Sequence, residues 1–200
     1  MTGCRRSGAG EEKRMFDYEK QFSRFLDEHG LDLRLSFGMP AGYETANGMF
    51  DPGSNTVFIN AEQLGDAPDW EKAFYFFHEL RHALQHLRTE QFSEEIRRSL
   101  RYVIMYDGTC YRLDGGREWE CRLDGGEEVF AGLYLGQPYE ADANAYAYEQ
   151  ARKLCGASEG LDRLYAFWTP DRPIAPEAYG AVYASIDEKI QEKPERRANE

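Results

Sequence analysis

The stretch FYFFHELRHALQH, residues 74–86, constrains the fold of this chain more than any other feature. It places His78, His82 and His86 four residues apart, which is about one turn of a helix, so the three lie along one side. Most of the remaining positions are apolar, and we expect this helix to be buried in the core. The apolar residues are Ala73, Phe76, Phe77, Leu80, Ala83, Leu84 and Leu87.

The histidine spacing favours a metal site on this helix. His78 and His82 can direct their imidazoles at a common point, and Glu79 lies beside the first of them. In an HExxH pattern two neutral imidazoles bind Zn²⁺, and the glutamate takes a proton from the metal-bound water. The pattern also arises by chance, with the histidines bonded to core carboxylates and no metal present. Because burying imidazoles without partners costs free energy, the sequence predicts zinc, with Glu79 as general base.

The third histidine is not expected to join the same ion. His78 and His86 are about 12 Å apart along the helix axis, which is too far for one tetrahedral site. The extended metzincin pattern is excluded too, because Gln85 and Arg88 occupy the positions where it requires glycine and histidine. We therefore expect His86 in the core or behind the ligands, and a carboxylate as the third ligand.

The segment YEADANAYAYEQARKL, residues 139–154, supplies that carboxylate. Glu140 is the predicted ligand, and small residues around it allow a close approach to the histidine helix. Asn144, four residues later, is predicted to accept the N–H on the far side of a ligating imidazole. Asp142 is the competing ligand, although it points to a different face. The alternative for this segment is an amphipathic helix whose acidic residues only face water.

Two motifs together resemble those of the ImmA/IrrE-type zinc metallopeptidases: HELRH at 78–82 and EADANAYA at 140–147. The segment NGMFDPGSNTVFIN at 47–60 is similar to the strand pair that precedes the helix in that family. The resemblance implies a compact α+β, zincin-like domain of the gluzincin type that cleaves a protein or peptide, such as a regulatory protein. It implies that His78, His82 and Glu140 are the zinc ligands and that Glu79 is the general base.

The chain is expected to form one α+β domain over residues 12–192, after a flexible N-terminus at 1–11 and before a polar tail at 193–200. A small antiparallel sheet is predicted to pack on the histidine helix, and the C-terminal half is predicted to be mainly helical. Strands are predicted at 31–37 and on both sides of the Pro-Gly-Ser-Asn turn within 47–60. Helices are predicted at 12–29, up to about residue 88, and at 138–154, 159–168 and 177–192.

Three further predictions concern helix ends and the middle of the chain. Asp66 or Asp69 is expected to cap the histidine helix, and Ser93 to cap a helix through SEEIRRSLRYVIMY. The first of two RLDGG motifs is expected to close a hairpin, because Asp-Gly favours a tight turn. Residues 88–136 are interpreted as a surface insertion, which is either a lid over the site or an inert loop.

Composition limits the partners. The formal net charge of −12 repels phosphate backbones and anionic lipids, so neither nucleic acid nor membrane is expected as a partner. No secretory signal or apolar span is visible, and a cytoplasmic protein with reduced thiols is expected. In an oxidising compartment Cys110 and Cys121 could pair across the hairpin. The oligomeric state stays open.

The sequence leaves the oxyanion donor open and allows a second function. An extended substrate is expected to add to an edge strand near Thr56–Asn60, and Tyr106, Tyr139 and Arg81 are the candidate donors to the oxyanion. The main alternative function is a zinc-bound sensor or interaction domain of the same fold that has lost proteolysis.

Overall fold

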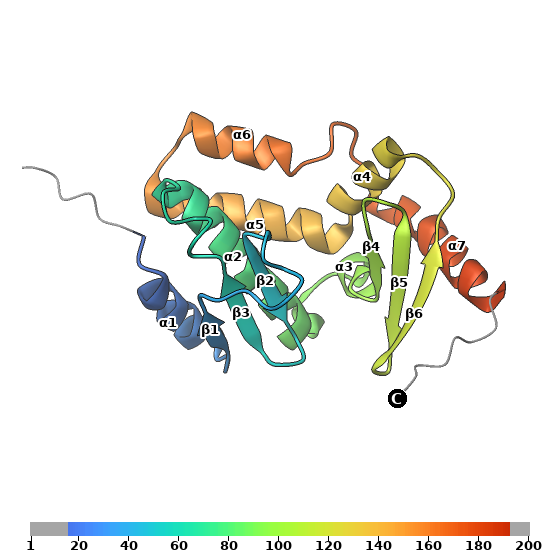
Figure 1. Ribbon diagram of the computed structural model, residues 1–200, viewed down its shortest axis with the longest axis horizontal. Helices are drawn as coiled ribbons and strands as arrows, with labels where there is room; N and C mark the ends of the chain where they lie inside the picture. Colours follow the sequence, from blue (N-terminus) through green and yellow to red (C-terminus); the bar gives the residue numbers. More distant parts are fainter. Residues whose placement is uncertain (1–15, 193–200) are drawn as a thin grey trace, which may run out of the picture.

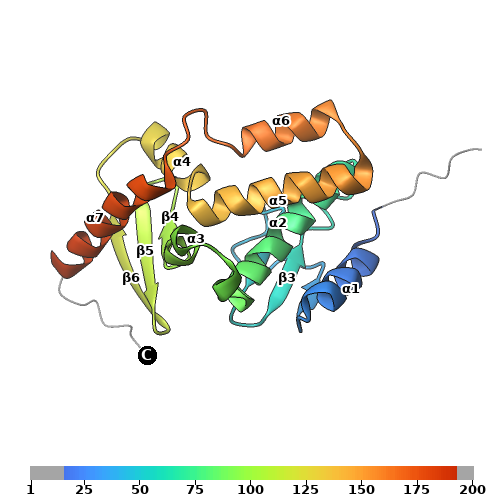
Figure 2. The same ribbon diagram turned by 180° about the vertical axis from the view of Figure 1, so that it is seen from behind.

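The computed structural model describes residues 16–192, in which two helices, α2 (Asp69–Leu87) and α5 (Pro138–Cys155), pack against each other at the centre. One three-stranded sheet and helix α1 (Tyr18–His29) lie on one side of the molecule, as Figure 1 shows. A second three-stranded sheet lies on the other side, and α5 runs between the side of the first sheet and the side of the second (Figure 2). The α+β class is confirmed. The predicted flexible N-terminus at 1–11 and polar tail at 193–200 lie outside the described residues.

The first sheet is mixed, whereas an antiparallel sheet was predicted. It contains β1 (Arg34–Ser36), β2 (Gly48–Asp51) and β3 (Thr56–Ile59) in the order β1-β3-β2. The predicted turn joins β2 to β3 as an antiparallel pair, but β1 runs parallel to β3 because residues 37–47 return the chain to the opposite edge. Strand β3 is therefore central and bonded on both sides. The free edge next to α2 belongs to β2, so the expectation of an edge strand near Thr56–Asn60 was wrong.

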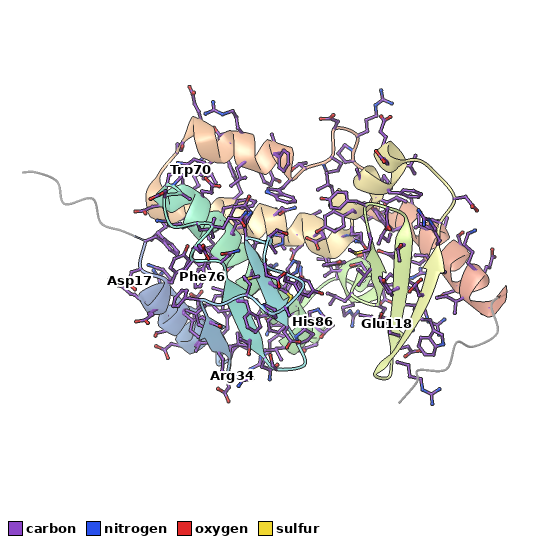
Figure 3. The ribbon with its side chains drawn as sticks, viewed as in Figure 1. Asp17, Arg34, Trp70, Phe76, His86 and Glu118 are labelled. Carbon is purple, nitrogen blue, oxygen red and sulfur yellow. The ribbon has the colours of Figure 1, made fainter. Side chains whose placement is uncertain are left out.

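Helix α1 and the first sheet enclose an aromatic core with α2. Phe76, labelled in Figure 3, is fully buried. Its ring centroid lies 5.6 Å from that of Phe16 and 5.4 Å from that of Tyr18. Burying aromatic side chains contributes roughly 1.5–3 kcal/mol each, so this cluster accounts for much of what holds α2 in place. Residues of this core on α2 include Ala73, Phe74, Phe77, Leu80, Ala83 and Leu84.

The predicted cap of α2 was wrong. The helix begins at Asp69, as the sequence indicated, but Pro68 occupies the N-cap position and no side chain caps the helix. The Asp69 carboxylate instead accepts the backbone N–H of Phe16 at 3.1 Å and joins the two segments. The end at Leu87 agrees with the predicted end near residue 88.

The segment after α2 was predicted only in part. Ser93 caps α3 (Glu94–Ser99) by accepting the N–H of Ile96, as expected. The helix ends there, and the β-branched and aromatic residues that follow form β4 (Tyr102–Ile104). The 3-10 turn η1 (Thr89–Gln91) precedes α3, and the 3-10 turn η2 (Pro176–Ala178) precedes the last helix.

The predicted hairpin is confirmed. Strand β5 (Thr109–Asp114) pairs antiparallel with β6 (Arg117–Arg122), and Asp114 lies opposite Arg117. Gly115 and Gly116 form the turn with φ of +56° and +77°, values that glycine adopts without steric cost. The RLDGG pattern therefore acts as a two-residue turn here.

Residues 88–136 do more than form a surface insertion. The buried faces of β4, β5 and β6 pack with α4 (Glu127–Leu135) and α7 (Tyr179–Glu192) into a second hydrophobic cluster. Helix α6 (Glu159–Phe167) covers α5 from the other side. The segment is thus part of the core, because its alternating strand residues need an apolar partner layer. The second cluster consists of Tyr102, Ile104, Cys110, Cys121, Leu133, Tyr179, Tyr183 and Ile186.

Within the described part of the chain, no helix combines the length and apolar character needed to cross a membrane.

A glycine at the start of the hairpin provides a test of this packing. Gly108 has φ of +83°, and a Cβ placed there would lie 2.5 Å from the Phe130 ring. Gly108→Ala should therefore lower the free energy of unfolding by about 2–4 kcal/mol, from backbone strain plus overpacking. Gly116→Ala is the matched control, since its φ is also positive but no atom lies within 4 Å of the added Cβ. Urea denaturation should show a clearly smaller loss for the control, and equal losses would contradict the close packing of Phe130.

Candidate metal centre

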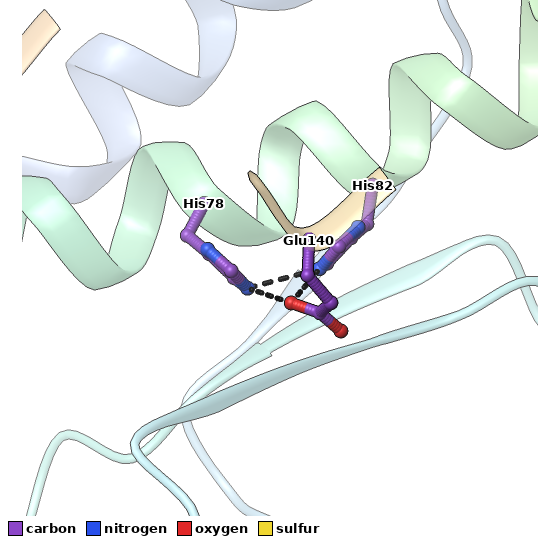
Figure 4. A group of neighbouring side chains, drawn as sticks. All are labelled: His78, His82 and Glu140. Carbon is purple, nitrogen blue, oxygen red and sulfur yellow. Dashed lines mark hydrogen bonds and ion pairs between the residues drawn. The ribbon is translucent and has the colours of Figure 1, made fainter. Parts of the chain in front are cut away.

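His78, His82 and Glu140 converge on one point, as Figure 4 shows. The Nε2 atoms of the two histidines are 2.9 Å apart, and the Glu140 Oε2 lies 3.4 Å from the first and 3.6 Å from the second. Ligand atoms on neighbouring corners of a tetrahedral zinc site are separated by roughly 3.3 Å, given metal–ligand distances of about 2.0–2.1 Å. Two imidazole nitrogens and one carboxylate oxygen thus form a group that could hold a metal ion.

Two helices position these side chains. His78 and His82 are one turn apart on α2, while Glu140 lies in the first turn of α5, which begins at Pro138. The two helices approach closely because α5 presents alanines to α2, and Ala143 and Ala147 are fully buried. The small residues that the sequence placed after Glu140 therefore bring the carboxylate within reach of both imidazoles.

Charge is balanced within this group. Burial alone would raise the pKa of Glu140, but His82 and His78 hold it well below its usual range. Burial alone would lower the pKa of His82, but the adjacent Glu140 and Glu79 carboxylates raise it to about 9. A proton on His82 thus takes the place that a cation would fill, and a metal ion must displace it.

A buried glutamine fixes the orientation of the His82 ring. Gln85 is fully buried, and its Nε2 donates to the Tyr139 carbonyl and to the Asp142 carboxylate, both at 2.8 Å. Both amide hydrogens are therefore used, and the Oε1, 2.9 Å from His82 Nδ1, can only accept. This makes Nδ1 of neutral His82 the protonated nitrogen, and the Nε2 lone pair points at Glu140 and His78. A ligating imidazole needs this tautomer.

The network continues from Gln85 to a partly buried ion pair between Arg81 and Asp142. Arg81 donates two hydrogen bonds to Asp142, at 2.7 and 2.9 Å, and its guanidinium lies over the rings of Phe92 and Tyr146. Asp142, the competing ligand in the sequence, is therefore engaged away from the metal group. Arg81 is engaged as well, so the structure removes it from the candidate oxyanion donors.

Asn144 does not make the contact predicted for it. Its Nδ2 donates to the Trp168 carbonyl at 3.0 Å, and the far nitrogen of His82 is bonded to Gln85 instead. The Nδ1 of His78 is buried and has no hydrogen-bond partner among the described residues. The sequence offered one signal for Gln85, because it follows His82 by three residues on the same helix.

His86 lies outside the group. Its side chain is exposed, and its ring centroid is 5.8 Å from that of Phe50. It therefore neither joins the three ligands nor forms part of the core.

Glu79 is buried beside the ligands. Burial raises its pKa above the usual value, the two histidines lower it, and Glu140 raises it further. The first residue of β2 allows this position, because a Cβ on Gly48 would lie 2.8 Å from the Glu79 Cγ and 3.2 Å from the Phe58 carbonyl oxygen. Only glycine lets the strand pass this close to the carboxylate.

The group opens into a pocket of about 220 Å³. Loop and strand residues 45–48, both central helices, the end of α4 and Trp168 surround it. Its lining residues next to the ligands are Glu79, Tyr134 and Gly48. His78 and Glu140 line this pocket, so a small molecule or a segment of a peptide can reach these two candidate ligands from solvent.

Comparisons of the chain with protein-family models, with curated proteins and with solved structures give no match.

The glutamine network yields a prediction. Gln85→Leu should weaken Zn²⁺ affinity about 10- to 100-fold, because His82 loses the acceptor that fixes its tautomer. The measurement is competition for zinc against a chromogenic chelator at pH 7.5. Gln150→Leu on α5 is the control, since this half-buried glutamine lines a pocket away from the metal group. Unchanged affinity in Gln85→Leu would show that the network does not tune the ligand.

The raised pKa of His82 gives a pH dependence. Its stabilising interaction with Glu140 in the metal-free protein is complete below pH 6.5 and is lost as the pH rises through about 9. Metal binding must remove this proton, so the apparent zinc affinity should rise about tenfold per pH unit between pH 6.5 and 8.5. Titrations in metal buffers at several pH values measure the slope. His86→Gln should leave the slope unchanged, and a flat profile in the wild type would contradict a proton on His82.

Proposed function

We propose that the protein is a zinc-dependent metallopeptidase, similar to the ImmA/IrrE type, that hydrolyses peptide bonds of a protein substrate. The observation that carries the proposal is the convergence of His78, His82 and Glu140 beside the buried carboxylate of Glu79. Three protein ligands with one open side toward a pocket are typical of catalytic rather than structural zinc sites.

The residues present fit Zn²⁺. Two imidazoles and a carboxylate are ligands that zinc prefers, and the bonded tautomer of His82 suits ligation. When bound, the ion supplies Lewis acidity, which polarises the scissile carbonyl and lowers the pKa of a water molecule. His78, His82 and Glu140 would hold it.

Glu79 is the proposed general base. Its burial raises its pKa, so the carboxylate gains affinity for a proton compared with an exposed glutamate. It would accept a proton from the attacking water and then give that proton to the leaving amine. A backbone hydrogen bond from Phe50 reaches the Glu79 carboxylate, and both Glu79 and Gly48 line the pocket.

The substrate is proposed to bind as an extended peptide along β2. This strand has a free edge next to α2, whereas β3 is bonded on both sides. Backbone hydrogen bonds to a sheet edge bind peptides with little demand on sequence. Gly48 at the start of β2 lies beside Glu79, so a peptide on this edge passes the metal group.

Tyrosines remain as donors to the oxyanion. Tyr134 lines the pocket, and burial together with Glu140 raises its pKa, so its hydroxyl keeps the proton that it donates. Its ring contacts that of Tyr106 in a tilted arrangement, with centroids 4.2 Å apart, and burial raises the pKa of Tyr106 to about 12. Tyr139 is engaged differently, since its hydroxyl lies near Gln137 and interacts with Glu140.

The decisive experiment separates zinc binding from hydrolysis. Glu79→Gln should keep stoichiometric zinc and lose at least about a hundredfold of the chelator-sensitive cleavage of an unfolded protein such as casein, because the base is gone. Glu140→Ala should lose zinc as well as cleavage. Glu71→Gln, on the same helix but away from the pocket, is the control and should retain both.

Two outcomes would contradict the proposal. Cleavage that survives in Glu79→Gln would remove the general base. Wild-type protein that binds zinc but cuts neither casein nor co-purifying proteins would favour the zinc-bound, proteolytically inactive sensor domain.

A further inference from the structure

The pocket extends from the metal group into a recess with apolar walls. We call this the aromatic recess, and it combines side chains from α2, from the end of α4 and from the residue after α6. Phe74 is 1% exposed, so its ring forms a fixed floor rather than a mobile surface group. The recess is lined by Ala46, Phe74, Tyr75, Leu135 and Trp168.

Trp168 forms a wall that is fixed at two points. Its Nε1 donates to the Tyr75 hydroxyl at 3.4 Å, and its carbonyl accepts from Asn144 at 3.0 Å. The Tyr75 and Trp168 rings meet edge to face, with centroids 6.3 Å apart. Asn144 thus connects the recess to α5, one turn after the ligand Glu140, and the wall is held in register with the metal group.

The charges of the pocket are confined to the ligands and the base. Among the residues that line the pocket, the acidic and histidine side chains are His78, Glu79 and Glu140, and none is a lysine, arginine or aspartate. The walls of the recess therefore carry no charged side chain. The other polar lining residues of the pocket, Thr45, Asn47 and Asn144, are uncharged, so a charged substrate group placed there would lose water without gaining an ionic partner, which is unfavourable. The recess therefore selects against acidic and basic side chains.

The size of the pocket suits one bulky side chain. The whole pocket measures about 220 Å³, while an apolar cavity of about 150 Å³ is enough to bind benzene. Space for one ring thus remains beside the metal group. An alanine side chain would leave most of the recess unfilled.

We propose that the aromatic recess is a specificity subsite for a bulky apolar side chain, aromatic or long aliphatic, on a residue that flanks the scissile bond. This inference rests on the proposed function. It defines the substrate class as extended peptides with such a residue at the cleavage position, and it makes Trp168 a specificity-determining residue with Asn144 as its positioning residue.

The test measures binding instead of turnover. Zinc-loaded Glu79→Gln protein is titrated by calorimetry with acetohydroxamate and with the N-acetyl hydroxamates of phenylalanine, alanine and glutamate, whose hydroxamate group binds the metal. The phenylalanine compound should bind about 10- to 100-fold more tightly than the alanine compound, because it buries a ring. The glutamate compound should bind no better than the alanine compound.

Trp168→Ala in the same background should reduce the phenylalanine preference by at least tenfold while acetohydroxamate binds as before. Phe167→Ala is the matched control, because this neighbouring ring is 70% exposed and does not line the pocket. Equal affinities for the phenylalanine and alanine compounds, or a preference that survives Trp168→Ala, would overturn the subsite. Absence of zinc and acetohydroxamate binding would overturn the proposed function itself, so the two failures are distinguishable.

Discussion

The close packing of α2 against α5 positions every group in the candidate site. Both ligand-bearing helices are held by the apolar core on one side and by buried alanines at their contact, which sets a short distance between their backbones. Larger residues at Ala143 or Ala147 would separate the helices, and Glu140 would no longer reach His78 and His82. The chemistry of the site thus depends on small side chains that take no part in it.

A hydrogen-bonded chain reinforces the same contact. It runs from Arg81 through Asp142 and Gln85 to His82, and so crosses between the two helices twice. Each member satisfies the next, and Gln85 is fully buried, so the loss of one partner leaves another unpaired in a region of low dielectric. Such a network fixes the ring orientation of His82 more firmly than packing alone. It also explains why Asp142, acidic and close to the site, is not a ligand.

Local patterns in the sequence were enough to predict the candidate ligands, the candidate base and the hairpin. The spacing of His78, Glu79 and His82 and the position of Glu140 each follow from one or two turns of helix, and the hairpin follows from its Asp-Gly turn. The partner of the His82 ring could not be predicted in the same way, because Gln85 is fixed by contacts with Tyr139 and Asp142 more than fifty residues away. The parallel pairing of β1 and the second hydrophobic cluster also depend on distant segments, and periodicity alone carries no information about them.

The position of the ligands along the chain has a mechanical consequence. His82 and Glu140 lie at the two ends of the segment that contains β4, β5, β6 and α4, so an ion held between them would act as a clasp on that loop. An ion that binds only the folded state stabilises it by mass action, and at a thousand times its dissociation constant it adds about 4 kcal/mol to the stability. The cation would then act as a cross-link between the two halves of the molecule, and the stability that it adds would depend on the free metal concentration. Unfolding of the second sheet would thereby be coupled to unfolding of the first.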